Sequence, residues 1–359
     1  MYWSLRGLVR ACAFRGIIAM LPIALMCAYA PPSVPSSLTA QIEPTAEIVS
    51  APSTIGIADS GLYGQTQAQI DQTLDTLQSI GVQDIRVFVP WIFVEPAQGT
   101  YNWSYMDMVM QAAADRNMGV MVEIASTPTW AGSSTSITGA GTPDPATYAA
   151  FAAEVAKRYG STISAYEIWN EPNYVLSSDP IDATAYAALL KAAYPAIKAI
   201  QPDATVIAAG LSRATGPDAP TKFLADMYAN GARKFFDATA MHPYVFPGGI
   251  AEDGDNGWSD LVRVHDLMTV NGDGDKKVWM TELGASTCAP QARGVSQDEQ
   301  ARQILQVLSG VAGTGWSGPA FIFAVRDTDT AKRDDLESNF GALLTSDWKP
   351  KYTAAVLAR

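Results

Sequence analysis

From Thr54 onward, short apolar runs alternate with longer stretches in which apolar residues recur every three or four positions. The short runs have the length of buried strands, and the longer stretches have the period of amphipathic helices. Eight runs are predicted strands: 55–58, 85–89, 120–125, 165–169, 205–209, 238–242, 278–282 and 320–325. The chain therefore reads as strands and helices in strict alternation.

The intervals between these runs carry the helical pattern. Ile70, Leu74 and Leu77 share one helical face, and Ser296 with Glu299 is typical of a capping box that opens a helix. Neighbouring strands are about 30 to 46 residues apart, which is enough for one strand and one crossover helix. Eight such units predict an α/β protein with a (β/α)₈ TIM barrel over residues 54–359. A doubly wound sheet is the alternative, but no glycine loop of the dinucleotide-binding type is present.

The first 30 residues have the pattern of an export signal. Arg6, Arg10 and Arg15 precede an apolar stretch, and the run 28–30 is a small-x-small cleavage sequence. An uncleaved anchor is the alternative, although the apolar stretch is short for a membrane span of about 20 residues. Residues 31–53, rich in Pro, Ser, Ala and Thr, are predicted to be a linker. The protein is expected to be secreted or held in the cell envelope.

Charge and cysteine content narrow the classes of partner. The formal net charge is −12, and removal of the three signal arginines would make it −15. Such a balance argues against nucleic acid and against anionic membrane surfaces as partners after signal cleavage. Only Cys288 would remain in the mature chain, so no intrachain disulfide is expected. We expect a monomer whose fold is stabilised by its apolar core alone.

Two of the predicted strands end on a glutamate. The fourth runs into Trp169, Asn170, Glu171 and Pro172, and the seventh ends on Glu282 before Leu-Gly. The carboxyl ends of all strands in a parallel barrel meet at one rim, which is where active sites are built. Two carboxylates flanking one bond are what glycoside cleavage requires. The alternative to a catalytic pair is that both glutamates are exposed at the strand ends and form salt bridges with basic side chains.

The Trp-Asn-Glu-Pro run and the Thr-Glu-x-Gly context of Glu282 resemble clan A retaining glycoside hydrolases, most closely glycoside hydrolase family 39 and related exopolysaccharide-cleaving enzymes of the cellulase-like superfamily. The resemblance spans residues 55 to about 352. It implies that Glu171, on strand four, is the acid/base and that Glu282, on strand seven, is the nucleophile. It also implies a carbohydrate substrate, with Asn170 contacting the sugar 2-hydroxyl.

Other residues match the same clan. Arg86, inside the second predicted strand, corresponds to an arginine that holds the nucleophile, and a structural pair with Glu123 is the alternative for a buried charge. His242 and Tyr244 match a His-x-Tyr motif in which the tyrosine touches the nucleophile and the histidine lines the sugar subsite. A lone histidine is otherwise more often structural.

Aromatic residues in the predicted loops are candidates for stacking on sugar rings. Trp130 follows the third strand, and packing in a loop is its alternative role; the others are Tyr174, Trp258 and Trp316. Members of the clan often carry a tryptophan at the end of strand eight. Here that position offers Phe323 as an apolar floor, or Arg326 and Asp327 as groups that reach the substrate.

No metal and no cofactor are expected. The aspartate and glycine clusters at 253–255 and 273–275 lack the spacing of a calcium loop, and the chain holds only two histidines. The sequence thus predicts a secreted retaining glycoside hydrolase that cleaves a poly- or oligosaccharide. A glycan-binding barrel without turnover is the alternative, and loss of either glutamate would be its mark.

Overall fold

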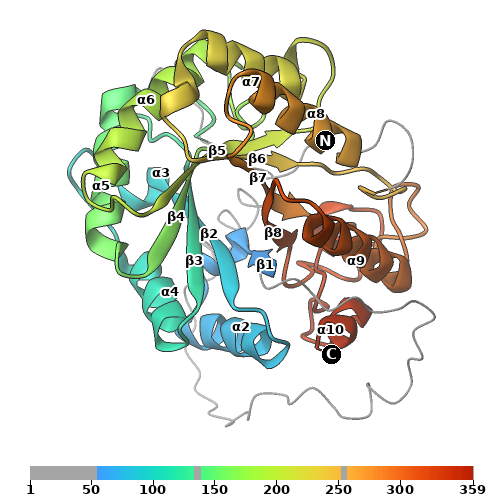
Figure 1. Ribbon diagram of the computed structural model, residues 1–359. Helices are drawn as coiled ribbons and strands as arrows, with labels where there is room; N and C mark the ends of the chain where they lie inside the picture. Colours follow the sequence, from blue (N-terminus) through green and yellow to red (C-terminus); the bar gives the residue numbers. More distant parts are fainter. Residues whose placement is uncertain (1–54, 133–138, 252–256, 359) are drawn as a thin grey trace.

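The computed structural model describes residues 55–132, 139–251 and 257–358. Its eight strands are all parallel to their neighbours and close into one barrel in chain order, with β8 paired to β1 (Figure 1). The strands are β1 (Ile55–Ala58), β2 (Asp84–Pro90), β3 (Gly119–Ala125), β4 (Ile163–Ile168), β5 (Thr205–Ser212), β6 (Ala238–His242), β7 (Lys277–Leu283) and β8 (Ser317–Phe323). The predicted (β/α)₈ barrel is confirmed. The predicted signal and linker lie outside the described residues.

The predicted strands agree with the observed ones, with small differences at their ends. β1 and β6 have the predicted bounds, whereas β8 begins at Ser317 and ends two residues early, at Phe323. The early end has a local cause: the next backbone N–H, of Ala324, donates to the carbonyl of Phe340 in a following loop at 3.1 Å. The chain therefore leaves the barrel ladder at Phe323.

Helices surround the barrel on its outside (Figure 1). They are α2 (Gln67–Ser79), α3 (Trp91–Val94), α4 (Ser104–Asp115), α5 (Pro145–Tyr159), α6 (Ala183–Lys198), α7 (Pro220–Ala229), α8 (Gly257–Val270), α9 (Gln297–Gly313) and α10 (Tyr352–Leu357). The capping box is partly confirmed, since Ser296 accepts from the backbone of Glu299 at the start of α9. No helix among the described residues is long and apolar enough to cross a membrane.

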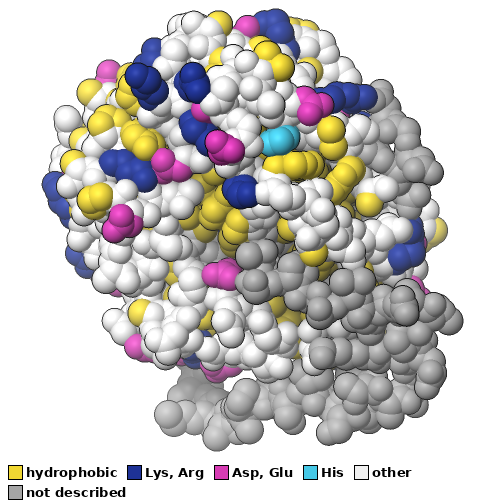
Figure 2. All heavy atoms as spheres, in the orientation of Figure 1, with side chains coloured by type: hydrophobic (Ala, Val, Ile, Leu, Met, Phe, Trp, Pro, Cys, Tyr) yellow, Lys and Arg dark blue, Asp and Glu magenta, His cyan; other side chains and the backbone are white. Residues whose placement is uncertain are grey.

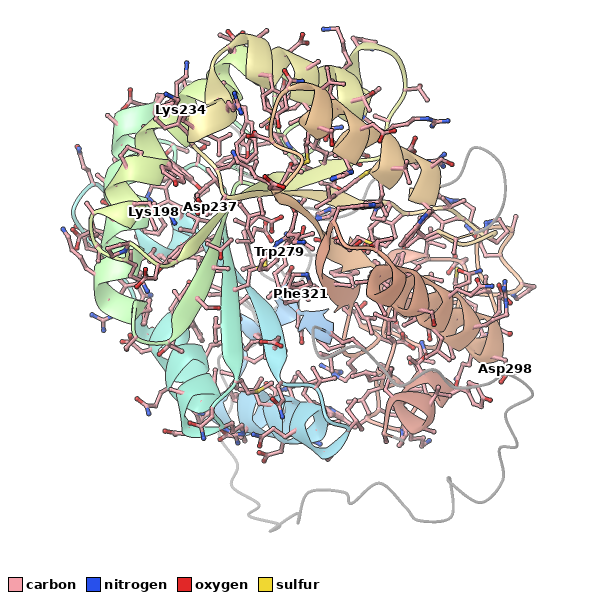
Figure 3. All side chains as sticks on the ribbon, viewed as in Figure 1. Lys198, Lys234, Asp237, Trp279, Asp298 and Phe321 are labelled. Carbon is pink, nitrogen blue, oxygen red and sulfur yellow. The ribbon has the colours of Figure 1, made fainter. Side chains whose placement is uncertain are left out.

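Two separate apolar layers hold the fold together. The larger lies between the outer faces of the strands and the helices, and the smaller fills the inside of the barrel. Trp279 of β7 and Phe321 of β8 stack inside the barrel with ring centroids 6.3 Å apart (Figure 3). Gly56 and Gly318 make room for these rings, because a Cβ at either glycine would lie 2.4 Å or 2.3 Å from a ring atom. The barrel is thus a packed core.

Two of the aromatic residues in the predicted loops, Trp258 and Trp316, lie away from the rim that carries the glutamates. Trp316 directly precedes β8, so it lies at the amino end of the strands, opposite the rim that carries the glutamates. Trp258, at the start of α8, packs against Trp316 and Gly310. The prediction that these two tryptophans lie along a substrate cleft is therefore wrong.

On the face shown in Figure 2, the described lysines and arginines are interspersed with acidic side chains.

Candidate active site

Glu171 lies at the carboxyl end of β4 in a constrained backbone. Trp169 and Glu171 have φ values of 74° and 42°, which are unfavourable for residues with side chains and cost about 1–3 kcal/mol each. The turn is fixed from both sides, because the Trp169 N–H donates to Ile124 of β3 and the Glu171 N–H donates to Gly210 of β5. The Glu171 side chain is only 7% exposed. Neighbouring strands therefore hold this carboxylate in one place.

Glu282 lies near the end of β7 and is 7% exposed. Its distance from Glu171 is bounded by His242, whose Nδ1 is 3.0 Å from Glu171 Oε1 and 3.7 Å from Glu282 Oε2. The two carboxylate oxygens cannot be farther apart than the sum of these distances, about 6.7 Å. Residues 111 positions apart in the chain are thus brought to one rim, as the sequence predicted.

Arg86 of β2 is the centre of the buried polar network. Its guanidinium is 1% exposed and donates to Glu282 Oε1 at 2.9 Å and to Asn170 Oδ1 at 3.0 Å. It also pairs with Glu167 Oε2 at 2.7 Å and with Glu123 Oε2 at 3.0 Å. Arg86 therefore makes both predicted contacts, with Glu282 and with Glu123, because a single guanidinium presents five donors in a fixed plane.

Glu167 is a member of this network that the sequence analysis did not identify. It is fully buried inside β4, where its Oε1 accepts from the Gly210 N–H at 2.8 Å and from the Thr281 hydroxyl at 2.7 Å. Both of its oxygens are occupied, since Oε2 accepts from Arg86. Glu167 could have been recognised in the sequence, because a charged residue inside an apolar strand needs a buried partner. The same argument had singled out Arg86.

Three carboxylates, those of Glu123, Glu167 and Glu282, share the one guanidinium of Arg86. Burial raises the pKa of Glu123 to about 8; Arg86 opposes the rise, and the charges of Glu167 and Glu282 add to it. Glu123 is therefore a neutral acid near pH 7, which leaves the positive charge of Arg86 to Glu167 and Glu282.

His242 shares one proton with Glu171. Because the Thr281 hydroxyl donates its hydrogen to Glu167, its oxygen must accept from His242 Nε2, 3.0 Å away. A neutral His242 then has a bare Nδ1, which faces Glu171 Oε1 at 3.0 Å. A proton must lie between these two atoms, carried either by the acid or by the ring. The Glu171–His242 pair therefore holds one proton at the rim of the barrel.

The environment of His242 favours keeping that proton. Burial by itself lowers the pKa of His242, but the charge of Glu282 and the hydrogen bond to Glu171 raise it above its ordinary value. His242 is 1% exposed and both ring nitrogens contact protein groups. His242 is thus packed against Glu171, Glu282 and Thr281, and its predicted role in lining a sugar subsite stays a prediction.

Tyr244 donates its hydroxyl hydrogen to Glu282 Oε2 at 3.1 Å, as the motif implied. Its ring belongs to an aromatic group with Phe246, Phe340 and Phe323, whose ring centroids are 5.6–5.8 Å from a neighbour in the group. Phe323, the last residue of β8, thus lies in an apolar layer beside the nucleophile candidate. This agrees with the expected apolar floor.

The alternative that Asp327 reaches the substrate is wrong. Its side chain is buried, 1% exposed, and it accepts from Lys351 Nζ at 3.1 Å and from Thr330 at 2.9 Å. Arg326 lies with its guanidinium over the Trp348 ring, at 4.6 Å from the centroid, and donates to the Ser346 carbonyl. Both residues tie the loop after β8 to the C-terminal segment.

Trp130 combines packing with partial exposure. Its ring lies edge-on against buried Trp91 at 5.7 Å, and its Nε1–H donates to the Glu95 carbonyl at 3.0 Å. The remaining surface lines a shallow hollow with Pro143 and Thr147. Loop packing is therefore established for Trp130, whereas sugar stacking stays a prediction.

Within the described ranges, no cluster of three or more His, Cys, Asp or Glu residues is arranged to hold a metal ion.

Comparisons with known proteins agree with this geometry. A search of curated proteins found no match to this chain. Among solved structures, a family 39 glycoside hydrolase from Bacteroides cellulosilyticus WH2 is similar, with 24% identity and a TM-score of 0.68 over 86% of this chain and 64% of its own. A monomeric β-xylosidase from Caulobacter crescentus CB15 has 19% identity and a TM-score of 0.63 over 85% of this chain and 66% of its own.

A family 5 (GH5_18) structure from Streptomyces cattleya, in complex with GlcNAc, has 19% identity and a TM-score of 0.63 over 86% of this chain and 80% of its own. At these identities the likeness establishes the fold, and the chain spans only about two thirds of the first two structures. A family model for cellulase (glycosyl hydrolase family 5) matches residues 45–318, which is most of the chain. The chain therefore belongs to the cellulase family, glycosyl hydrolase family 5, within the clan that the two glutamate motifs indicated.

Proposed function

We propose that this protein is a retaining glycoside hydrolase in which Glu282 is the nucleophile and Glu171 the acid/base. The observation that carries the proposal is that Glu171 Oε1 and Glu282 Oε2 lie on either side of His242 Nδ1, no more than about 6.7 Å apart, which excludes most of the separations that inverting enzymes use. Retaining enzymes keep their carboxyl groups roughly 5–5.5 Å apart, whereas inverting ones need about 6.5–9.5 Å to fit a water molecule.

In the first step, a Glu282 oxygen attacks the anomeric carbon while the bond from that carbon to the departing oxygen breaks. Glu171 transfers the proton of the Glu171–His242 pair to the departing oxygen. In the second step, Glu171 takes a proton from water, whose oxygen displaces Glu282 from the sugar. Two inversions give the product the configuration of the substrate.

The neighbours of Glu282 suit a nucleophile. Arg86 binds one of its oxygens and Tyr244 the other, so the carboxylate is ionised and fixed in orientation, yet each oxygen keeps a second lone pair. Arg86 also donates to the Oδ1 of Asn170, which fixes the orientation of the amide; its nitrogen is the donor group of this side chain. We propose that this nitrogen donates to the sugar 2-hydroxyl, a contact that strengthens in the transition state.

Covalent trapping tests the nucleophile. An activated 2-fluoro glycoside of a sugar that the enzyme accepts is expected to add one glycosyl mass to the protein, because the fluorine slows release of the intermediate more than its formation. Peptide mapping should place the label on Glu282, in the segment Lys277–Leu283. A label on another carboxylate would contradict the assignment, and proton NMR of the first-formed anomer checks retention independently.

The role of Glu171 is tested by substrates with different leaving groups. Glu171→Ala is expected to abolish most cleavage of glycosides with poor leaving groups, where loss of general acid catalysis costs about 10²–10⁴-fold. Activated aryl glycosides should keep their first step, and added azide should give a glycosyl azide of unchanged configuration. Equal losses for good and poor leaving groups would show that Glu171 is not the acid.

We further propose that the enzyme is exported by its first 30 residues and cuts a polymer internally. The acidic mature chain and the basic, then apolar, N-terminal sequence support export. The mass of the protein recovered from the culture medium tests cleavage of the signal, and the product sizes at early times test internal cutting. If no aryl glycoside or polysaccharide is cleaved, while glycan binding persists, the barrel that binds without turnover is the correct description.

A further inference from the structure

Three aromatic rings are exposed together on the segment that follows β2. In the described part of the chain, the exposed large hydrophobic side chains are three valines and three aromatic residues. The aromatic ones are Phe93, Tyr101 and Tyr105, with exposed fractions of 38%, 38% and 37%, and all three lie within residues 93–105. Single exposed apolar residues are ordinary on a protein surface, whereas a group of them in one place points to a ligand.

The aromatic surface, defined as Phe93, Tyr101 and Tyr105, lies on the same side of the barrel as the two glutamates. Phe93 belongs to α3, which begins directly after β2, and Tyr105 belongs to the first turn of α4. In a β/α barrel these positions adjoin the carboxyl ends of the strands. The Tyr63 ring joins the two, because its centroid lies 6.3 Å from that of Phe93 and 5.3 Å from that of Tyr105.

The Tyr101 ring is held in place by a stack that reaches into the core. Tyr101 stacks on Trp103 with centroids 5.3 Å apart and 14° between the planes, and Trp103 stacks on buried Phe151 at 6.0 Å and 2°. The Asn102 N–H donates to the Val94 carbonyl at 2.7 Å, which ties this segment to α3. A ring fixed in advance loses little conformational freedom when a ligand stacks on it.

The stretch 91–105 carries almost no charge. Glu95 is its one charged residue; it is 4% exposed, and its oxygens accept from Trp91 Nε1 and from the Gly99 N–H, both at 2.8 Å. The exposed polar residues of the stretch have amide or hydroxyl side chains: Gln98, Thr100, Tyr101, Asn102, Ser104 and Tyr105. Aromatic faces beside uncharged hydrogen-bonding groups suit a neutral sugar, which presents both C–H faces and hydroxyls.

The aromatic surface is separate from the network around the two glutamates. Ile85 and Val87, on either side of Arg86, belong to the layer between strands and helices, so Arg86 points to the inside of the barrel. Trp103, which supports Tyr101, packs against that outer layer. A ligand on the aromatic surface therefore lies at the outer edge of the rim.

We propose that the aromatic surface is a second carbohydrate-binding site, which holds an uncharged polysaccharide strand while the proposed catalytic pair acts on it. The class of ligand rests on the glycoside hydrolase function proposed above. A stable protein partner needs about 800 Å² on each side, far more than three rings that are mostly buried can offer. A sugar needs only a ring face and a few hydrogen bonds.

Affinity electrophoresis tests the proposal, with xylan, hydroxyethyl cellulose and glucomannan as uncharged probes and alginate as an anionic one. The double variant Phe93→Ala with Tyr105→Ala should bind the retarding neutral polymer about 10–100-fold more weakly, because each lost ring removes a stacking contact. The kcat/KM for that polymer should fall with the binding. The kcat/KM for an aryl glycoside should remain unchanged, since the Arg86 network is untouched, and alginate should retard neither protein.

Two further variants are the controls. Phe93→Tyr with Tyr105→Phe keeps both ring faces and should bind as wild type does. Val270→Ala removes an exposed apolar side chain at the end of α8, where 84% of Val270 is exposed, and should also leave binding unchanged.

Equal retardation of the alanine variant and wild type by every neutral polymer, including none for either, would overturn the proposal. So would light scattering that finds two copies of the wild-type chain but one of the alanine variant, because the rings would then join copies of the protein. Polymer binding that depends on the rings, in a protein that cleaves no glycoside, would instead refute the proposed function and retain this site.

Discussion

At the scale of single residues, Gly210 decides whether the proton-holding pair can form. A Cβ at this position would lie 2.2 Å from His242 Nε2 and 2.7 Å from the Thr281 hydroxyl. The Gly210 backbone also binds both sides of the site, since its N–H donates to Glu167 and its carbonyl accepts from Glu171. A residue without a side chain is therefore needed for His242 to reach Glu171.

Gly210→Ala is expected to displace His242 and to lower kcat about 10–100-fold, because misplacing a catalytic group by about 1 Å has an effect of that size. The measurement is kcat with an aryl glycoside, together with the far-UV circular dichroism of the variant. Gly313→Ala, at the end of α9 where a Cβ meets no atom within 4 Å, is the control and should retain full activity. Full activity of Gly210→Ala would show that His242 has no part in holding the proton.

At the scale of elements, a buried ion pair attaches the C-terminal segment to the loop after β8. Lys351 and Asp327 are 2% and 1% exposed, and Lys351 Nζ also donates to Thr287, in the loop after β7. Burial lowers the pKa of Lys351 and raises that of Asp327, while their mutual attraction opposes both changes. Lys351 thus joins the C-terminal segment to the loops after β7 and β8.

Lys351→Met is expected to lower the free energy of unfolding by about 3–5 kcal/mol, because it leaves the buried carboxylate of Asp327 without its cation. Urea unfolding measures the loss. The double variant Lys351→Met with Asp327→Asn should recover part of it, since the uncompensated charge is gone. If the single and double variants were equally unstable, packing of the lysine stem rather than charge pairing would be the cause.

At the scale of the whole molecule, the buried acids make stability depend on pH. Glu123 keeps its proton in the folded state up to about pH 8, whereas an unfolded chain loses it near the ordinary value of 4.5. As the pH rises from about 4.5 to about 8, the unfolded state gains stability that the folded state does not. The native protein is therefore expected to lose stability through this window on account of Glu123.

Glu123→Gln removes that titration and keeps an oxygen for Arg86. The variant is expected to match wild type near pH 4 and to become more stable than wild type as the pH rises to 8, by an amount on the order of a few kcal/mol. Thermal unfolding at pH 4, 6 and 8 measures the difference. A constant difference between the two proteins across these values would show that Glu123 does not carry the proton.

The sequence by itself determined the barrel and brought together the two glutamates proposed as the catalytic pair. Strand and helix periodicities depend on local spacing, so eight alternating units were readable, and all eight strands were found at or near their predicted bounds. Glu171 and Glu282 were found because each ends an apolar strand, and the carboxyl ends of parallel strands must meet at one rim. Arg86 stood out as a charge in a buried strand.

Only the tertiary structure decided how these groups are connected. That Glu167 and Thr281 orient His242 depends on side-chain directions in strands far apart in the chain. Trp316 and Asp327 were misjudged for the same reason: their residue types suit sugar binding, but one lies at the amino end of β8 and the other is buried against Lys351. Residue type sets what a group can do, whereas its neighbours in space decide whether it does so.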